Sequence, residues 1–369
     1  MSETARSGGV LAGLVTLLAG AGTDVASAHV DYVVDSEDAV DAAVFLAETL
    51  STPLHALLVV GTAATVGAGA VAYLERRPLR EDVTAVRAAM ADYTDLVPWL
   101  LRIGVGFPLV GAGFSGYFIS PAVPADLRLL QVTLGFLLLF GLATRAAALT
   151  GLTAYLVGLS QAPELLLAGE FVAGFLAIAL VGPGRPSADD VLARVATSED
   201  TLYGQLDPVS GLADRVNDVL DPSRRFVPTV VRVGLGLQFV FLGITQKLAD
   251  PGPALAVVAR YDLTSVVPVD PALWVLGAGL AETAVGIALL VGLFTRAAGG
   301  AAFGLFTTTL FGLPDDPVLA HLSMFALVSA VLITGAGPLS LDARLHDEPA
   351  TNETDSTAET TPTAPASDD

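Results

Sequence analysis

Three ionisable residues of this chain have types and positions that could do chemistry inside a membrane: Lys247, Glu282 and His321. Lys247 is the only lysine, and it lies at the end of an apolar stretch typical of a membrane helix. An ammonium group in or near hydrocarbon is costly, so it needs a partner or a polar cavity and is by default a candidate functional residue. Glu282 would neutralise it, and His321 could accept or release a proton near neutral pH.

Helix geometry predicts that the three residues lie at one depth. Each is fourteen to sixteen positions from a residue expected at the cytoplasmic face, respectively Arg232, Arg296 and Gly337. At 1.5 Å per residue these separations are about 21–24 Å. An ammonium, a carboxylate and an imidazole on three helices would then meet in the outer leaflet of a core about 30 Å thick. We expect them to form the active site.

Structural interpretations compete with this one. Lys247 lies close to the external end of its span, where it could snorkel to the surface beside Asp250. His321 could pair with an acidic residue of the turn at 314–317. A buried Lys247–Glu282 pair could orient two helices without doing chemistry. Glu282, roughly in the middle of its span, is the hardest to explain in this way.

The composition predicts an all-α, polytopic membrane protein. Of 369 residues, 53% are hydrophobic and 15% are charged, whereas a soluble domain carries about 25% charge. Apolar runs long enough to cross a membrane, or nearly so, recur nine times, at about 54–74, 98–119, 127–144, 146–161, 164–182, 227–248, 271–294, 297–313 and 318–336.

The charge and the missing residue types narrow the function. A net charge of -20 with a single lysine suggests adaptation to high salt, and without a basic patch to neutralise phosphates we expect no nucleic-acid partner. The absence of cysteine excludes disulfides, thiolate nucleophiles and cysteine-ligated metal centres. No Gly-rich phosphate loop follows a strand, so no nucleotide cofactor is indicated.

Metal binding has one weak signal in the sequence. His29 would become the N-terminal residue if a signal peptide were cleaved after Ala28, and its amine and imidazole could then bind copper with Asp31 nearby. The four histidines show no three- or four-residue spacing, so haem ligation is not supported. We therefore expect no other metal site.

Six parts follow one another along the chain. A short apolar stretch before Ala26-Ser27-Ala28 predicts a signal peptide, with an uncleaved first anchor as the alternative. Arginines at the ends of the spans predict a multi-pass protein of the cell membrane with a cytoplasmic C-terminus, Arg128 and Arg260 being exceptions. The parts are the signal peptide at 1–28, an acidic external segment with the first span and a linker at 29–95, a four-helix unit at 96–186, a cytoplasmic linker at 187–225, a second four-helix unit at 226–345 and a disordered acidic tail at 346–369.

An internal repeat predicts two four-helix bundles side by side after one extra span. Leu101-Arg102-Ile103-Gly104-Val105-Gly106 matches Val231-Arg232-Val233-Gly234-Leu235-Gly236, and a Gly-Leu-x-Thr-Arg motif recurs at 141–145 and 292–296. In the first unit Tyr117, Gln131 and Glu170 take the positions of the lysine, the glutamate and the histidine. We therefore expect the active site in the second unit and, in the first, a scaffold or a weaker proton-handling carboxyl at Glu170.

The second unit resembles the DoxX/DoxD family of four-helix membrane proteins. The resemblance rests on the Arg-x-Gly-x-Gly opening, Gly-Ile-Thr-Gln-Lys-Leu at 243–248, Ala281-Glu282, Gly-Leu-Phe-Thr-Arg at 292–296 and a closing Gly-Pro followed by Ser340-Leu341-Asp342. It covers about 230–345, with a weaker copy at about 98–190, and leaves 1–95 uncovered. The family implies a membrane subunit, in some members tied to quinone-linked oxidation of thiosulfate or to a terminal quinol oxidase. Most members have no assigned reaction.

The resemblance and the polar residues together predict a subunit of a quinone-linked redox system. A quinone head group would enter from the outer leaflet; His321 or Glu282 would exchange the proton, and Lys247 would stabilise negative charge on the ring oxygen. The electron donor would be a partner protein or a small sulfur compound. The alternative is a non-enzymatic scaffold or a small-solute carrier. A carrier site between repeats would draw polar residues from both units, whereas here they concentrate in the second.

Overall fold

The computed structural model describes residues 40–125, 127–198, 201, 210–313 and 318–347, and helices make up nearly all of this part of the chain. No strand occurs in it; one isolated bridge joins Tyr117 and Pro124. The signal peptide, His29 and the acidic tail lie outside the described residues. The main helices are α3 (Ala42–Ser51), α4 (Pro53–Arg76), α5 (Arg80–Ala91), α6 (Val97–Ser115), α7 (Arg128–Phe140), α8 (Thr144–Leu159), α9 (Glu170–Val181), α10 (Ala188–Ala196), α12 (Ser210–Leu220), α13 (Val227–Gly243), α14 (Pro251–Arg260), α15 (Leu263–Val266), α16 (Pro271–Val291), α17 (Thr295–Gly312), α18 (Val318–Thr334) and α19 (Leu341–Asp347).

The long apolar helices match the expected spans to within a few residues, and four helical stretches are long and apolar enough to cross a membrane. The clearest differences lie at helix ends. The helix expected at 98–119 stops at Ser115 and the one at 127–144 stops at Phe140, because Gly116 and Gly141 follow in the left-handed conformation that closes a helix. The segment expected at 164–182 begins with a 3₁₀ turn, η2 (Pro163–Ala168), before α9.

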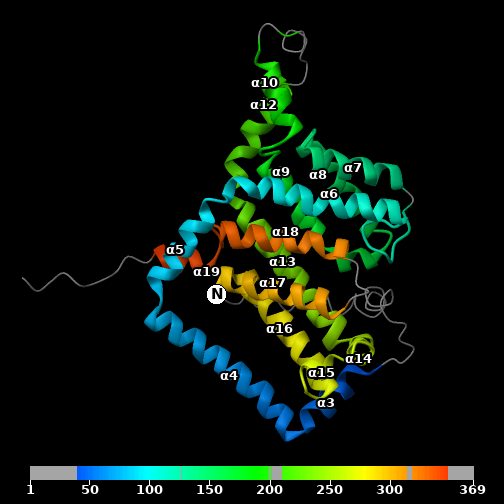
Figure 1. Cartoon of the computed structure of the whole chain (residues 1–369), viewed down its shortest axis with the longest axis vertical. Coiled ribbons are helices and arrows are strands. Elements are labelled where there is room, and N and C mark those ends of the chain that lie inside the picture. Colours follow the sequence, from blue (N-terminus) through cyan, green and yellow to red (C-terminus); the bar gives the residue numbers. More distant parts are fainter. Residues whose placement is uncertain (1–39, 126, 199–200, 202–209, 314–317, 348–369) are drawn as a thin grey trace, which may run out of the picture.

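Two units of four helices pack against each other (Figure 1). Helices α6 to α9 form the first unit, and α13, α16, α17 and α18 form the second. The first helix of each unit packs on the last helix of the other, so α6 contacts α18 and α13 contacts α9. A β-carbon at Gly104 would clash with that of Ala326, and one at Gly234 would clash with that of Ala173. Glycine thus permits the close approach of backbones on which this interface depends.

A buried arginine closes one end of each unit. Arg102 and Arg232 are 1% and 0% exposed. Arg232 donates to the carbonyl oxygens of Leu289, Leu290 (2.7 Å), Ala336 (3.0 Å) and Leu339 (2.6 Å). Arg102 donates to Pro186 O at 2.6 Å, while its Nε and Nη1 have no partner. From the sequence we interpreted these arginines as residues that orient the helices in the membrane. In the structure, both guanidinium groups donate hydrogen bonds to the loop that follows the last helix of the same unit.

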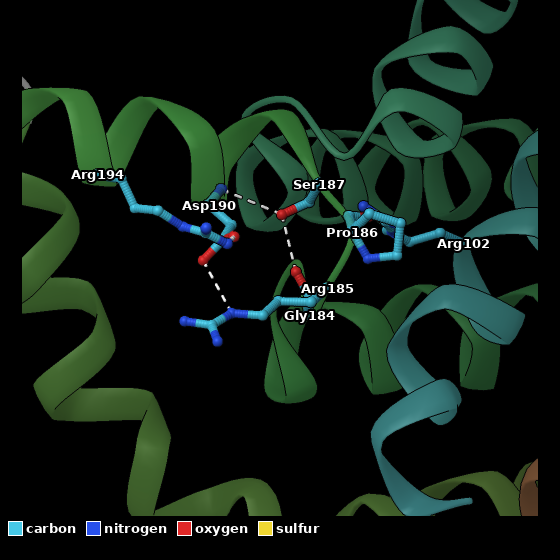
Figure 2. A network of polar contacts seen from close by, with 7 residues as sticks. All are labelled: Arg102, Gly184, Arg185, Pro186, Ser187, Asp190 and Arg194. Carbon is cyan, nitrogen blue, oxygen red and sulfur yellow. Dashed lines mark hydrogen bonds and ion pairs between the residues drawn. The ribbon is translucent and has the colours of Figure 1, made fainter.

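The loop after the first unit contains a second polar network, in which Arg185 and Arg194 are exposed while Ser187 is buried (Figure 2). Asp190 binds Arg185 Nε through Oδ1 at 3.0 Å and Arg194 Nη2 through Oδ2. Ser187 Oγ caps α10 by accepting from Asp190 N at 3.1 Å and donates to Gly184 O at 2.8 Å. This network orders the beginning of the linker at 187–225, which was expected to be polar.

One aspartate in each unit caps the third helix from outside. Asp189 accepts from Ala143 N at 2.7 Å and Thr144 N at 2.9 Å. Asp342 accepts from Phe294 N at 2.9 Å and from the next backbone N–H, that of Thr295, at 2.8 Å. A carboxylate at the positive end of a helix is favourable. The same hydrogen bonds therefore occur at matching positions of both units.

Helix α4 stands apart from both units over most of its length (Figure 1). It is apolar, and the window that qualifies it as a membrane span has no buried residue. Its two ends make contacts: Val59 packs near Phe45 of α3, and the ring of Tyr73 meets that of Phe294 edge-on at 5.5 Å. A bare apolar helix of this kind is stable in lipid rather than in water.

Candidate functional site

Lys247 and Glu282 form an ion pair in the second unit. Lys247 Nζ lies 2.9 Å from Glu282 Oε2, and the two side chains are 25% and 20% exposed. The lysine comes from the turn that extends α13, and the glutamate comes from the middle of α16. Depth reasoning from the sequence predicted this juxtaposition. The ammonium has three donors, so two are not used by Glu282 Oε2.

The turn that carries Lys247 is a π-helix, η4 (Ile244–Leu248). Its wider hydrogen bonding is visible in the bond from Ala249 N to Ile244 O, at 2.7 Å. Gly279 of α16 lets this turn approach closely, because a β-carbon there would lie 3.0 Å from Lys247 Cβ. Single π-turns of this kind occur often at functional sites. The insertion rotates Lys247 relative to a regular continuation of α13.

Gln246, next to the lysine, was not identified from the sequence. Its side chain is 5% exposed, and neither its Oε1 nor its Nε2 has a hydrogen-bond partner. A buried amide without partners is costly, so Gln246 does not stabilise this turn through hydrogen bonds of its side chain. The only sequence signal was its position inside the Gly-Ile-Thr-Gln-Lys-Leu motif.

His321 lies in a different place, in a pocket between the two units. The pocket is small and partly open to its surroundings, with a cavity volume of about 30 Å³, and neither Lys247 nor Glu282 lines it. Its polar walls come from Tyr117 and Glu170 of the first unit and from His321 of the second. The expected single group of lysine, glutamate and histidine is thus replaced by two groups. The prediction from helix rise concerned the depth of each side chain in the membrane and did not include the direction in which the side chain points.

Glu170 is the acidic residue among those that line the pocket, and it is 2% exposed. It begins α9, and its Oε1 accepts from Ser323 Oγ of α18 at 2.8 Å. Its Oε2 is buried and has no hydrogen-bond partner. The preceding 3₁₀ turn is held by Gln238 of α13, whose Nε2 donates to Leu167 O at 2.7 Å. Nothing in the sequence singles out Ser323, since serine in a membrane helix usually bonds its own backbone.

Gln131 and Tyr117 also lie together, but through the side chain of Gln131 and the backbone of Tyr117. Gln131 Nε2 donates to Tyr117 O at 3.2 Å and to Leu109 O at 3.0 Å. These two residues were matched to Glu282 and Lys247 by sequence position, and they lie together as that pair does. Gln131 is therefore bound to backbone, and the Tyr117 side chain is left to line the pocket.

Residues 227–322 match the family model described as DoxX. This part of the chain is a DoxX domain. No curated protein and no solved structure matches the chain. The DoxX domain begins with α13, contains the Lys247–Glu282 pair and ends just after His321 in α18. The DoxX match and the long apolar helices together identify the chain as a membrane protein.

The DoxX domain offers no evident metal centre. Among the described residues, no group of three or more His, Asp and Glu side chains could hold a metal ion. The copper site suggested for His29 lies outside the described residues. The polar chemistry available within the DoxX domain is therefore that of the Lys247–Glu282 pair and, at its border with the first unit, that of the pocket.

Proposed function

We propose that the chain is a membrane subunit of a quinone-linked redox system and that its quinone site is at the Lys247–Glu282 pair. The observation that carries the proposal is this ion pair between two apolar helices of the DoxX domain, partly exposed and with ammonium donors to spare. A ring carbonyl oxygen needs donors of this kind, so the residues present fit a quinone head group.

In this proposal each residue of the pair has one task. Lys247 donates a hydrogen bond to a ring oxygen and stabilises negative charge on it. Glu282 holds the ammonium in place and exchanges a proton through its carboxylate. A bound quinone would supply the capacity to accept two electrons and two protons. His321 lies in the pocket between the two units and has no task at this pair.

The remaining parts of the proposal follow from the sequence. The electron donor is a partner protein or a small sulfur compound, and lipid surrounds the apolar helices. The chain lies in the cell membrane with its C-terminus in the cytoplasm, since arginines gather at the ends of helices that would face that side. Lys247 and Glu282 then lie in the outer leaflet.

Binding of a short-chain ubiquinone analogue to the purified full chain tests the proposal. We expect Glu282→Gln and Lys247→Gln to weaken binding at least about tenfold, because each removes a charge of the pair. Glu164→Gln, the same change at a glutamate of η2 outside both polar groups, should bind as the wild type does. Equal affinity in wild type and Glu282→Gln would overturn the role of the pair.

A further inference from the structure

We propose that the pocket between the two units binds a small organic ammonium ion through Glu170. This site is separate from the Lys247–Glu282 pair, and the inference does not depend on the quinone proposal. It rests on a deeply buried carboxylate that has one free oxygen, borders an open space and draws its surroundings from both units.

The Glu170 carboxylate needs a positive partner that the described residues do not supply. Its Oε1 is satisfied by the Ser323 hydroxyl, whereas its Oε2 has no partner although it is shielded from solvent. No lysine or arginine lines the pocket. An ionised carboxylate without a cation is among the costliest groups to bury, so this one must carry a proton or receive a cation.

The rest of the pocket suits the head of an organic ammonium ion. His321 adds an imidazole and Tyr117 adds a phenol, two polar groups that can accept hydrogen bonds from an ammonium when neutral. Phe171 lines the same space and offers an aromatic ring, whose face attracts cations. Apolar side chains complete the wall, so the carbon skeleton of the ion has matching surroundings.

Ligand binding at this site exchanges one positive charge for another. Without a ligand, a proton on Oε2 keeps the pocket neutral. When the ammonium ion enters, that proton leaves to solvent and the carboxylate pairs with the cation. Among the described residues, the other titratable groups that face Glu170 are His321 of α18, Tyr117 after α6, and Tyr155 of α8, whose hydroxyl is already bonded to Leu165 O at 2.7 Å. None of the phenols ionises near neutral pH. In this proposal the proton that leaves is that of Glu170.

Calorimetric titration of the purified full chain with methylammonium chloride, an organic ammonium ion small enough for this cavity, tests the inference. Titrations near pH 7 in two buffers of different ionisation enthalpy count the protons released. For the wild type we expect binding with release of about one proton per cation. Glu170→Gln keeps the shape and the acceptor for Ser323 but should weaken binding at least about tenfold and abolish proton release. Glu164→Gln, six residues earlier, should behave as the wild type.

Three outcomes would overturn the inference. Equal affinity in wild type and Glu170→Gln would remove the carboxylate from the site. Equal binding of methanol, the neutral analogue, would show that charge does not matter, and equal proton release with sodium chloride would assign the site to an inorganic ion. If Glu170→Gln does not fold, the wild type alone decides: methylammonium must protect Glu170 from dicyclohexylcarbodiimide, which modifies protonated carboxyls in apolar surroundings, and absence of protection contradicts the proposal.

Discussion

Ser323 Oγ of α18 donates a hydrogen bond of 2.8 Å to Glu170 Oε1 of α9, and so joins the last helices of the two units. Both side chains are buried, at 1% and 2% exposure. A hydrogen bond from a hydroxyl to a carboxylate in such surroundings is strong and directional. It fixes the orientation of the carboxyl group and leaves its second oxygen without a hydrogen-bond partner.

The glycine contacts between the units predict a specific loss of stability and its repair. Gly104→Ala should lower the free energy of unfolding by about 1–3 kcal/mol, because its new methyl group meets that of Ala326. Adding Ala326→Gly should restore most of this loss. Gly300→Ala, at a helical glycine with no neighbour within 4 Å, serves as the control and should be neutral or slightly stabilising. Unfolding in SDS titrations measures all four proteins, and failure of the double variant to recover would contradict the contact.

The two buried arginines should differ in importance although they take matching positions. Arg232→Lys should destabilise the protein by about 2–4 kcal/mol, since lysine cannot reproduce a fork that reaches several carbonyls. Arg102→Lys should cost less, because Nε and Nη1 of Arg102 have no partners to lose. Melting temperatures in detergent provide the comparison, with exposed Arg225→Lys as the control. Equal losses at both positions would refute this account of the arginine ends.

A double-mutant cycle measures how strongly Lys247 and Glu282 interact. Lys247→Met and Glu282→Gln should each destabilise the protein by about 1–3 kcal/mol, because each leaves the partner charge partly buried. The double variant should cost at least about 1 kcal/mol less than the sum of the single changes. The free energy of unfolding of the four proteins gives the coupling. A coupling near zero would mean that the pair is held apart in solution.

The Asp190 network predicts a stability change at acidic pH. Hydrogen bonding to Arg194, and then to Arg185, lowers the pKa of Asp190 below its ordinary value of 3.8. A carboxyl with a lowered pKa in the folded state stabilises the protein fully above the unfolded value, and this contribution is lost as pH falls toward the folded one. Wild type should therefore melt at a higher temperature than Asp190→Asn at pH 6, and the difference should shrink as the pH falls below about 4. A constant difference from pH 6 to pH 3 would contradict the ion pairing.

Apolar periodicity and depth predicted the helices and one of the two polar groups. The Lys247–Glu282 contact followed from two distances along helix axes, since both helices belong to one unit and pack directly together. His321 was expected at the same depth in the membrane, but it lies in the pocket between the two units. Depth carries no information about which neighbouring helix a helix face contacts. That neighbour is α6 of the other unit, and only the packing of the units determines it.

Residue type was also an incomplete guide to role. Arg232 has the placement of an arginine that anchors topology, yet it is buried and bonded to carbonyls at the end of α16 and in the loop after α18. Glutamine and serine also occur in membrane helices in purely structural roles. The spacing of Gln246 and Ser323 therefore does not show whether each side chain bonds its own backbone, lacks a partner or bonds another helix. The polar groups were expected to concentrate in the second unit, but Glu170 and Tyr117 of the first unit also line the pocket.

The reciprocal packing of α6 on α18 and of α13 on α9 has a consequence for assembly. Either unit alone would leave one face of its first and last helices uncovered, so a chain with a single unit would have to recruit a second copy to cover them. Here the segment that links the two units keeps them at a high effective concentration, and association no longer depends on how much protein the bilayer contains. The covalent connection also lets the two units differ in detail, and one has a charged pair where the other has an amide bound to backbone.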